Sequence, residues 1–344
     1  MKTGFQARVN QISAPLSIDD ARAVTRGASC WVLSDGKAGD EAQCLGVAER
    51  LGLTPEIRRV APRAPFVWLM PWGGIDPREG PARPGSPLAG TLPDICIASG
   101  RRTASYLRKV KALSNGRCFT VFLKDPRSGT GTADFLWVPA HDRLRGANVL
   151  STLTSPHRFS PERLAEAAAH APYGLANLPT PRVALVIGGN SHHHNFSADN
   201  IAAFTRNVAA LAATGAGLMA TASRRTPPEL AVALRGIVTE SGGFFWDGTG
   251  ENPYPAMLAL ADAVVVTADS VNMVGEAAVT GKPVLVVTPD GGTAKITTFL
   301  AGLDALGATR PFAGRIEGAT YPPVDATPVI ACELARRYAA FRHA

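Results

Sequence analysis

A short stretch of the chain combines two carboxylates, a hydroxyl and an amide at spacings that suit a nucleotide. Residues 263–266 form an apolar, β-branched run that predicts a strand, and a helical pattern begins a few positions later. Asp269 and Ser270 then lie at a helix N-terminus, where free N–H groups and the helix dipole favour a phosphate. Asn272 and Glu276 share a face one turn further on, where a carboxylate suits a ribose diol. We therefore predict a nucleotide-diphosphate site in this segment.

A simpler interpretation of the same segment remains open. Ser or Asp at such a turn commonly serves only to cap the helix. Asp269 would repel a pyrophosphate unless its carboxylate points elsewhere, either to cap the helix or to meet a sugar hydroxyl. No Asp-x-Asp motif stands where it could hold a metal-bound diphosphate. We expect the helix N-terminus, together with Arg224 and Arg225, to meet the phosphate charge without a metal or any other cofactor.

Each half of the chain carries a pair of arginines directly after a predicted strand. Arg101 and Arg102 follow a strand in the first half, and Ser223, Arg224 and Arg225 follow one in the second. The carboxyl ends of strands are where open α/β sheets bind their ligands. We predict that the first pair contacts an anionic acceptor and that the second contacts the phosphates of a donor. Two solvated basic turns are the alternative.

A glycine-containing turn after the first strand offers a candidate general base. Asp35 stands at the strand end, and Lys37 could neutralise an acidic acceptor. Gly36 and Gly39 would let that acceptor approach the backbone closely. The alternative is an Asp-Gly turn followed by a helix that Asp40 caps.

A second glycine turn opens the second half of the chain. Gly188, Gly189 and Asn190 follow a predicted strand and would let a nucleotide or sugar approach, and three histidines, 192–194, come next. Adjacent histidines cannot all face one ion from a single strand or helix, and no cysteine or carboxylate spacing accompanies them. We expect no metal site.

Composition narrows the class of protein. The chain has 344 residues, of which 46% are hydrophobic and 18% charged, so it fits two globular domains rather than disorder. No apolar run approaches the roughly 20 residues that span a bilayer. The five cysteines form no CxxC pair and fit a reducing compartment. A net charge of +7 suits phosphate-bearing ligands or an anionic membrane surface, whereas the aromatic residues are not interleaved with the basic ones as nucleic-acid binding requires. We expect a cytoplasmic protein, peripheral to the inner membrane.

The elements that must position these residues alternate between strands and helices in both halves. The alternation predicts a flexible leader (1–27), a first Rossmann-like domain on the acceptor side (28–172), a linker (173–181), a second domain on the nucleotide-sugar side (182–325) and a C-terminal helix (326–344). The predicted strands lie at 31–34, 95–99, 119–123, 135–139, 182–187, 218–221, 243–246, 264–267 and 284–288.

One long irregular excursion interrupts the first half. Residues 61–93 are dense in proline and glycine and include Trp68 and Trp72. Long loops in compact domains tend to be functional or mobile.

These motifs, taken together, resemble the ELM1-like family over about residues 29–295. The resemblance rests on Ser34-Asp35-Gly36-Lys37-Ala38-Gly39-Asp40-Glu41 with Gln43, Ser99-Gly100-Arg101-Arg102-Thr103, Lys124-Asp125-Pro126-Arg127, Gly188-Gly189, Ser223-Arg224-Arg225-Thr226, Asp247-Gly248-Thr249-Gly250-Glu251-Asn252-Pro253-Tyr254 and Thr267-Ala268-Asp269-Ser270 with Met273 and Glu276. Plant members are linked to mitochondrial fission, and bacterial members are described as glycosyltransferases.

The resemblance implies an α/β fold of the GT-B type, with two Rossmann-like domains facing across a cleft and the donor nucleotide in the C-terminal half. It implies that Ser270 meets the diphosphate and that Glu276 meets the ribose.

Three functions follow from these predictions. The leading one is a metal-independent glycosyltransferase that moves a sugar from a nucleotide-sugar to a cell-envelope glycolipid or saccharide. The first alternative is a non-catalytic interaction protein of the same fold that acts in membrane or organelle fission, but such a scaffold would need no donor site. The second alternative is a nucleotide-sugar epimerase, which would need a pair of carboxylates where Asp35 supplies one.

Overall fold

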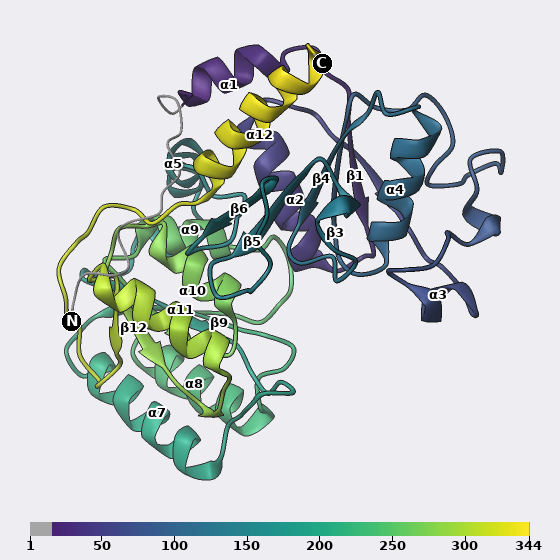
Figure 1. Ribbon diagram of the computed structural model, residues 1–344. Helices are drawn as coiled ribbons and strands as arrows, with labels where there is room; N and C mark the ends of the chain where they lie inside the picture. Colours follow the sequence, from purple (N-terminus) through teal and green to yellow (C-terminus); the bar gives the residue numbers. More distant parts are fainter. Residues whose placement is uncertain (1–15, 344) are drawn as a thin grey trace, which may run out of the picture. The chain divides into compact units, whose positions relative to one another are not determined.

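The computed structural model describes residues 16–343, which divide into two compact units (Figure 1). The first unit comprises residues up to 138 together with 144–150 and 327–344, and the second comprises 139–143 and 151–326. Each unit is built on a six-stranded sheet. No helix among the described residues is long and apolar enough to span a bilayer.

The first sheet follows the order β2-β1-β3-β4-β5-β6. Pairing from β2 through to β5 is parallel. The elements of this half are α1 (Ile18–Thr25), β1 (Cys30–Ser34), α2 (Ala38–Arg50), β2 (Glu56–Arg59), α3 (Phe66–Leu69), η1 (Pro77–Glu79), β3 (Ile95–Ser99), α4 (Thr103–Leu113), β4 (Phe119–Leu123), η2 (Thr130–Thr132), β5 (Phe135–Pro139), β6 (Val149–Thr152) and α12 (Thr327–Arg342).

The second sheet follows the order β10-β9-β7-β11-β12-β14, and all its pairs are parallel. A separate two-stranded ribbon joins β8 to β13. The elements are α5 (Pro161–Ala169), α6 (Tyr173–Ala176), β7 (Arg182–Ile187), β8 (His194–Asn195), α7 (Ala198–Ala212), β9 (Gly217–Ala222), α8 (Pro228–Glu240), β10 (Phe244–Trp246), α9 (Tyr254–Leu260), β11 (Ala263–Thr267), α10 (Val271–Ala278), β12 (Val284–Val287), β13 (Asp290–Gly291), α11 (Ala294–Ala305) and β14 (Thr309–Pro311).

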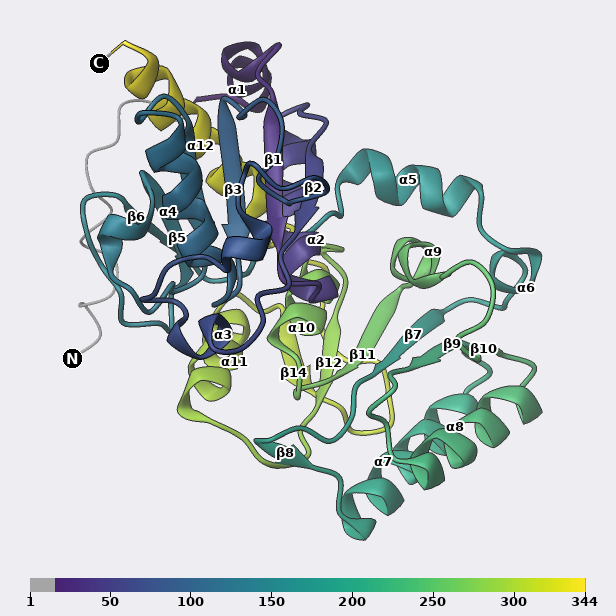
Figure 2. The same ribbon diagram turned by 90° about the vertical axis from the view of Figure 1, so that its right-hand side faces the viewer.

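Alternation along β7 explains why the second sheet is covered on both faces. Leu185 packs into one buried cluster with residues of α7 and α8, whereas Val186 packs into another with residues of α9, α10 and α11. Figure 2 shows α7 and α8 on one side of this sheet and α9 and α10 on the other. Parallel strands that are covered on both faces consist of continuous runs of apolar residues, and such runs can be recognised in the sequence.

Two parts of the chain lie in a different unit from the one we expect. Residues 151–172 belong to the second unit, because α5 packs on α9. The C-terminal helix α12 is not a separate element, since it packs on α1 and α2 of the first unit. The predicted linker contains α6, whose Leu175 is fully buried.

The leader is also shorter than expected. Ser17 caps α1 by accepting a hydrogen bond from the Asp20 N–H at 3.2 Å, and Ala21 and Thr25 of this helix are buried. The rest of the predicted leader, residues 1–15, lies outside the described residues.

Candidate functional site

In each sheet the predicted site residues lie at the point where the strand order reverses. In the second sheet β7 lies between β9 and β11, so the loops that follow these three neighbouring strands emerge at one edge. In the first sheet β1 lies between β2 and β3, and the loops after β1 and β3 emerge together. Such switch points are where open α/β sheets bind ligands.

Asp269 is the buried centre of the second unit's loops. Its side chain is 0% exposed and accepts hydrogen bonds from the Gly189 N–H at 3.1 Å and from Arg225 Nη2 at 2.9 Å. Thr267, which the sequence analysis does not select, donates to the other carboxylate oxygen at 2.7 Å and accepts from the Gly188 N–H at 2.7 Å. The carboxylate therefore links all three loops. It neither caps α10 nor points outward, so the expectation of a donor contact by Asp269 is not supported.

Gly188 and Gly189 are required by internal packing. A Cβ on Gly188 would lie 2.0 Å from an Asp269 carboxylate oxygen, and one on Gly189 would lie 2.0 Å from the backbone of Arg225. The sequence analysis explains these glycines by close approach of a ligand, but the structure explains them by close approach of neighbouring loops.

The two adjacent arginines have different surroundings. Arg225 donates to Asp269 and, through Nη1, to the Asn190 carbonyl at 3.2 Å, while the Asn190 N–H donates back to the Arg225 carbonyl at 3.0 Å. The Ser223 hydroxyl accepts from the Arg225 N–H at 3.2 Å. Arg224 is exposed and makes no hydrogen bond or ion pair within the described part of the chain. Arg225 therefore braces the loop, whereas Arg224 takes no part in this bracing.

The N-terminus of α10 agrees with the prediction. The Ser270 hydroxyl accepts from the Met273 N–H at 3.4 Å and so caps the helix. Asn272 lies in the first helical turn and is partly exposed. Ser270 therefore caps the helix, as the alternative interpretation also expects, and its contact with a phosphate stays a prediction. The other N–H groups of the first turn keep the character that favours an anion.

Glu276 lies at the inner end of the same helix and pairs with a tyrosine that the sequence analysis does not identify as its partner. The Tyr254 hydroxyl donates to Glu276 Oε2 at 3.0 Å, and the Tyr254 ring packs edge-on against Phe159 at 5.7 Å. Burial raises the pKa of Glu276 from 4.5 to about 7 and raises that of Tyr254 as well. Tyr254 could have been identified from the sequence, because it ends the motif Asp247 to Tyr254 that carries part of the family resemblance.

Asp35 is the main feature of the first unit's site. Its side chain is 1% exposed, and Lys37 Nζ lies 3.2 Å from Oδ2. Oδ1 is buried and accepts no hydrogen bond from any described residue. A Cβ on Gly100, which has φ of +93°, would lie 3.2 Å from the carboxylate, so the β3 loop closes over Asp35. Gly36 also has positive φ, +84°, and makes the turn.

The remaining predicted acceptor residues are only partly where we expect them. Arg101 and Arg102 follow Gly100 directly and are exposed. Gly39 is not in the loop, because α2 begins at residue 38. Asp40 does not cap that helix and instead forms an ion pair with Lys124.

The three histidines at 192–194 differ in their exposure. His194 is buried and pairs with Gly291 in the β8–β13 ribbon, whereas His192 and His193 are exposed. No group of three or more metal-ligating side chains comes together within residues 16–343.

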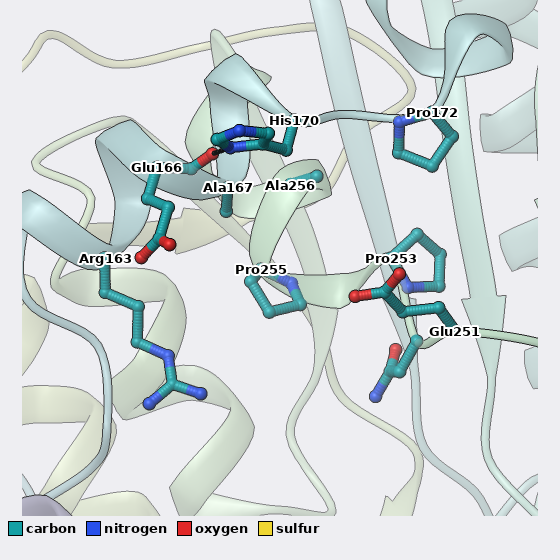
Figure 3. Close-up of a pocket in the computed structure, with 10 residues that line it drawn as sticks. Arg163, Glu166, Ala167, His170, Pro172, Glu251, Pro253, Pro255 and Ala256 are labelled. Carbon is teal, nitrogen blue, oxygen red and sulfur yellow. Dashed lines mark hydrogen bonds between the residues drawn. The ribbon is translucent and has the colours of Figure 1, made fainter.

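A cavity of about 390 Å³ lies apart from the predicted donor residues, between α5 and the loop before α9 (Figure 3). Arg163 and Glu166 project from α5, and Glu251 stands on the opposite side. The lining of the cavity includes two carboxylates, Glu166 and Glu251, which would repel a diphosphate.

Two sequence comparisons agree on one family. A family model described as Mitochondrial fission ELM1 matches residues 38–338. The Mitochondrial fission protein ELM1 of Arabidopsis thaliana is 32% identical over 275 residues, which make up 72% of this chain and 64% of that protein. The chain thus spans less than two thirds of that relative's length.

Solved structures resemble the chain in fold. UDP-GlcNAc 2-epimerase from Methanocaldococcus jannaschii matches with a TM-score of 0.51 and 9% identity, over 90% of this chain and 98% of that one. MurG from Acinetobacter baumannii matches with a TM-score of 0.44 and 12% identity, over 92% and 97% of the two chains. At 9% identity the first likeness concerns the fold alone, and it agrees with the two Rossmann-like α/β units of a GT-B protein.

Proposed function

Because the chain belongs to the mitochondrial fission ELM1 family and has braced loops at the strand ends of a GT-B fold, we propose that it is a metal-independent glycosyltransferase. It would move a sugar from a nucleotide-sugar to a cell-envelope glycolipid or saccharide. The observation that carries the proposal is the contrast between Arg224 and Arg225: the second arginine is held by Asp269, whereas the first is exposed in the same loop after β9 and has no partner among the described residues.

The donor would be held by the second unit. Arg224 and the first-turn N–H groups of α10 would meet the diphosphate, with Ser270 setting where that helix begins. Glu276 would accept from the ribose hydroxyls, with Tyr254 fixing its orientation. Asp269 acts through its neighbours as a positioning residue, since both oxygens of its carboxylate already accept hydrogen bonds, from Gly189, Arg225 and Thr267.

The acceptor would be held by the first unit. Lys37, Arg101 and Arg102 supply positive charge for an anionic acceptor, and Asp35 would be the general base. The acceptor hydroxyl would give its proton to Asp35, and its oxygen would bond to the anomeric carbon. The bond from that carbon to the diphosphate oxygen would break, and the nucleoside diphosphate would leave with the electron pair. Its added charge would be met by the donor-side groups, each worth roughly 3 kcal/mol where well placed.

A non-catalytic interaction protein remains the second candidate, because the name of the plant relative refers to fission and not to transfer. An interaction protein would retain the fold and the Asp269 brace, since these stabilise the unit, but would not need Arg224. Nucleotide binding therefore separates the two candidates.

The first test is calorimetric titration with UDP, GDP, ADP and CMP. We expect one nucleotide to bind, with affinity about tenfold weaker in Arg224→Ala and in Glu276→Ala. Arg206→Ala, an exposed arginine on α7, is the matched control and should bind as the wild type does. If none of the nucleotides binds, the transferase proposal fails and the interaction protein is favoured.

The second test follows the sugar. With the matching nucleotide-sugar and an envelope extract, labelled sugar should enter an acceptor, and Asp35→Asn should lower the rate about a hundredfold or more. Conversion of the nucleotide-sugar without any extract would instead indicate an epimerase.

A further inference from the structure

We propose that the exposed side chains of Trp68, Leu69 and Trp72 form a docking surface that adsorbs the first unit to an anionic lipid bilayer. We call these three residues the tryptophan patch. Their exposed fractions are 73%, 53% and 68%, which is unusual for large apolar side chains so close in sequence. Figure 1 shows α3, which carries two of them, on a loop below the end of α4.

The backbone that carries the patch is anchored from inside. Met70 is fully buried, and Pro71 beside it is buried as well. The Pro71 carbonyl accepts from Ser105 Oγ at 3.0 Å and from Arg108 Nη2 at 2.5 Å. The Gly73 carbonyl also accepts from Ser105 Oγ, at 2.8 Å. The patch is therefore held outward by a fixed support, and its exposure is not the result of a loose loop.

Charge around the tryptophan patch suits an anionic surface. Residues 61–75 contain no acidic residue, and the next residue in the chain is Asp76. Asp76 is buried and accepts from Arg78 Nε at 2.9 Å and from the Arg63 N–H at 3.0 Å. Glu79 accepts from the Ala61 N–H at 2.8 Å. Asp76 is thus paired with a cation inside the unit, and the carboxylate of Glu79 is held by hydrogen bonds from the Ala61 N–H and the Tyr106 hydroxyl.

Two exposed arginines, Arg63 and Arg127, are connected to the segment that carries the patch. Arg63 lies one helical turn before Val67, whose N–H donates to the Arg63 carbonyl at 3.1 Å. Arg127 adjoins Ser128, whose hydroxyl accepts from Nη1 of the same Arg108 that anchors Pro71. The guanidinium groups of Arg63 and Arg127 make no ion pair within residues 16–343.

An anionic bilayer is the occupant that fits this chemistry best. Tryptophan prefers the headgroup region, because its ring is apolar and its N–H is polar. A few inserted apolar side chains bind weakly alone, and basic residues strengthen them near anionic lipids. The inference does not depend on the proposed transfer, since adsorption needs neither nucleotide nor Asp35.

Co-sedimentation of the full chain with phosphatidylcholine vesicles, with and without phosphatidylglycerol, tests the inference. We expect binding to the anionic vesicles and weak binding to the neutral ones. Trp68→Ser/Trp72→Ser should weaken binding about tenfold or more, and Arg63→Ser/Arg127→Ser should weaken it about fivefold for each arginine lost. Matched controls are Tyr173→Ser/Leu306→Ser and Arg206→Ser/Arg315→Ser, which remove exposed side chains elsewhere and should bind normally.

Fluorescence gives a readout that loss of folding could not mimic. Brominated lipid should quench the wild type more than Trp68→Phe/Trp72→Phe, a conservative variant that should still sediment with the vesicles. Absence of wild-type binding to anionic vesicles, or equal binding by the Trp68→Ser/Trp72→Ser variant, would overturn the inference. Concentration-dependent dimerisation that this variant abolishes, without vesicle binding, would assign the patch to a second copy of the chain instead.

Discussion

At the scale of single residues, two neighbouring guanidinium groups have different surroundings, and only one of them stabilises the fold. Arg225 donates a hydrogen bond to the Asp269 carboxylate, which has no access to solvent, whereas Arg224 is exposed and makes no such bond. Removing a partner from a buried charge costs more than the pair contributes, because the remaining charge is left uncompensated. Two substitutions at adjacent positions should therefore have opposite consequences.

We expect Arg225→Ala to lower the free energy of unfolding by about 2 kcal/mol, a moderate value because the guanidinium is half-exposed. Arg224→Ala should change it by less than about 0.5 kcal/mol. Urea denaturation of the two variants checks this, and similar losses in both would contradict the division of roles.

Glu276 predicts a dependence of stability on pH. Its folded pKa of about 7 exceeds the ordinary 4.5, so the folded state binds more protons between these values. Its contribution is fully present below pH 4.5 and is lost as the pH rises through 7. Relative to Glu276→Gln, the wild type should lose about 2 to 3 kcal/mol of unfolding free energy across this window.

Chemical denaturation of wild type and Glu276→Gln at matched pH values measures the difference. Parallel curves from pH 4 to pH 8 would mean that folding does not raise the pKa of Glu276.

At the scale of elements, the glycine turn after β7 shows what sequence can and cannot reveal. The strands are evident from their apolar runs, and the loops with Gly188, Arg224 and Asp269 are found as strand ends. Which side chain faces inward is not evident, because that depends on the contact of one loop with the next. Asp269 fits either a capping or a ligand role by spacing alone, and only the neighbouring Arg225 and Gly189 decide it.

The turn itself should not tolerate a methyl group. Gly189→Ala would place a Cβ 2.0 Å from the Arg225 backbone, so we expect a loss of about 3 kcal/mol together with weaker nucleotide binding. Gly236→Ala in α8 is the matched control, since nothing lies within 4 Å of its Cβ, and it should stabilise the helix by about 0.5 to 1 kcal/mol. Thermal melts of both variants decide the point, and a neutral Gly189→Ala would refute the close contact.

At the scale of the whole molecule, the last helix, α12, belongs to the first unit, although residues 151–326 of the second unit precede it in the chain. Leu334 and Ile330 of α12 are fully buried, and Tyr338 packs against Phe119 of β4 at 5.8 Å. The sequence predicts the helix within two residues of its bounds, but amphipathic periodicity does not show which sheet it covers. That long-range pairing could only come from the folded chain.

We expect Leu334→Ala to destabilise the first unit by about 3 kcal/mol, because it leaves a cavity in a buried contact. Val329→Ala, on the exposed side of the same helix, should cost less than about 0.5 kcal/mol. Hydrogen exchange read by mass spectrometry should show faster exchange in β1, β3 and β4 than in the wild type, with β7 and β11 unchanged. Equal loosening of both sheets would contradict the assignment of α12 to the first unit.

The return of α12 makes the second unit an insertion within the first. Apart from residues 139–143, the second unit is one continuous piece of chain, 151–326, so we expect that this piece can be produced alone. The other half arrives in separate parts that must be rejoined, for example by a short glycine-serine bridge from residue 150 to residue 327. During synthesis on the ribosome, the sheet of the first unit is likewise not fully covered until α12, at the end of the chain, has been made.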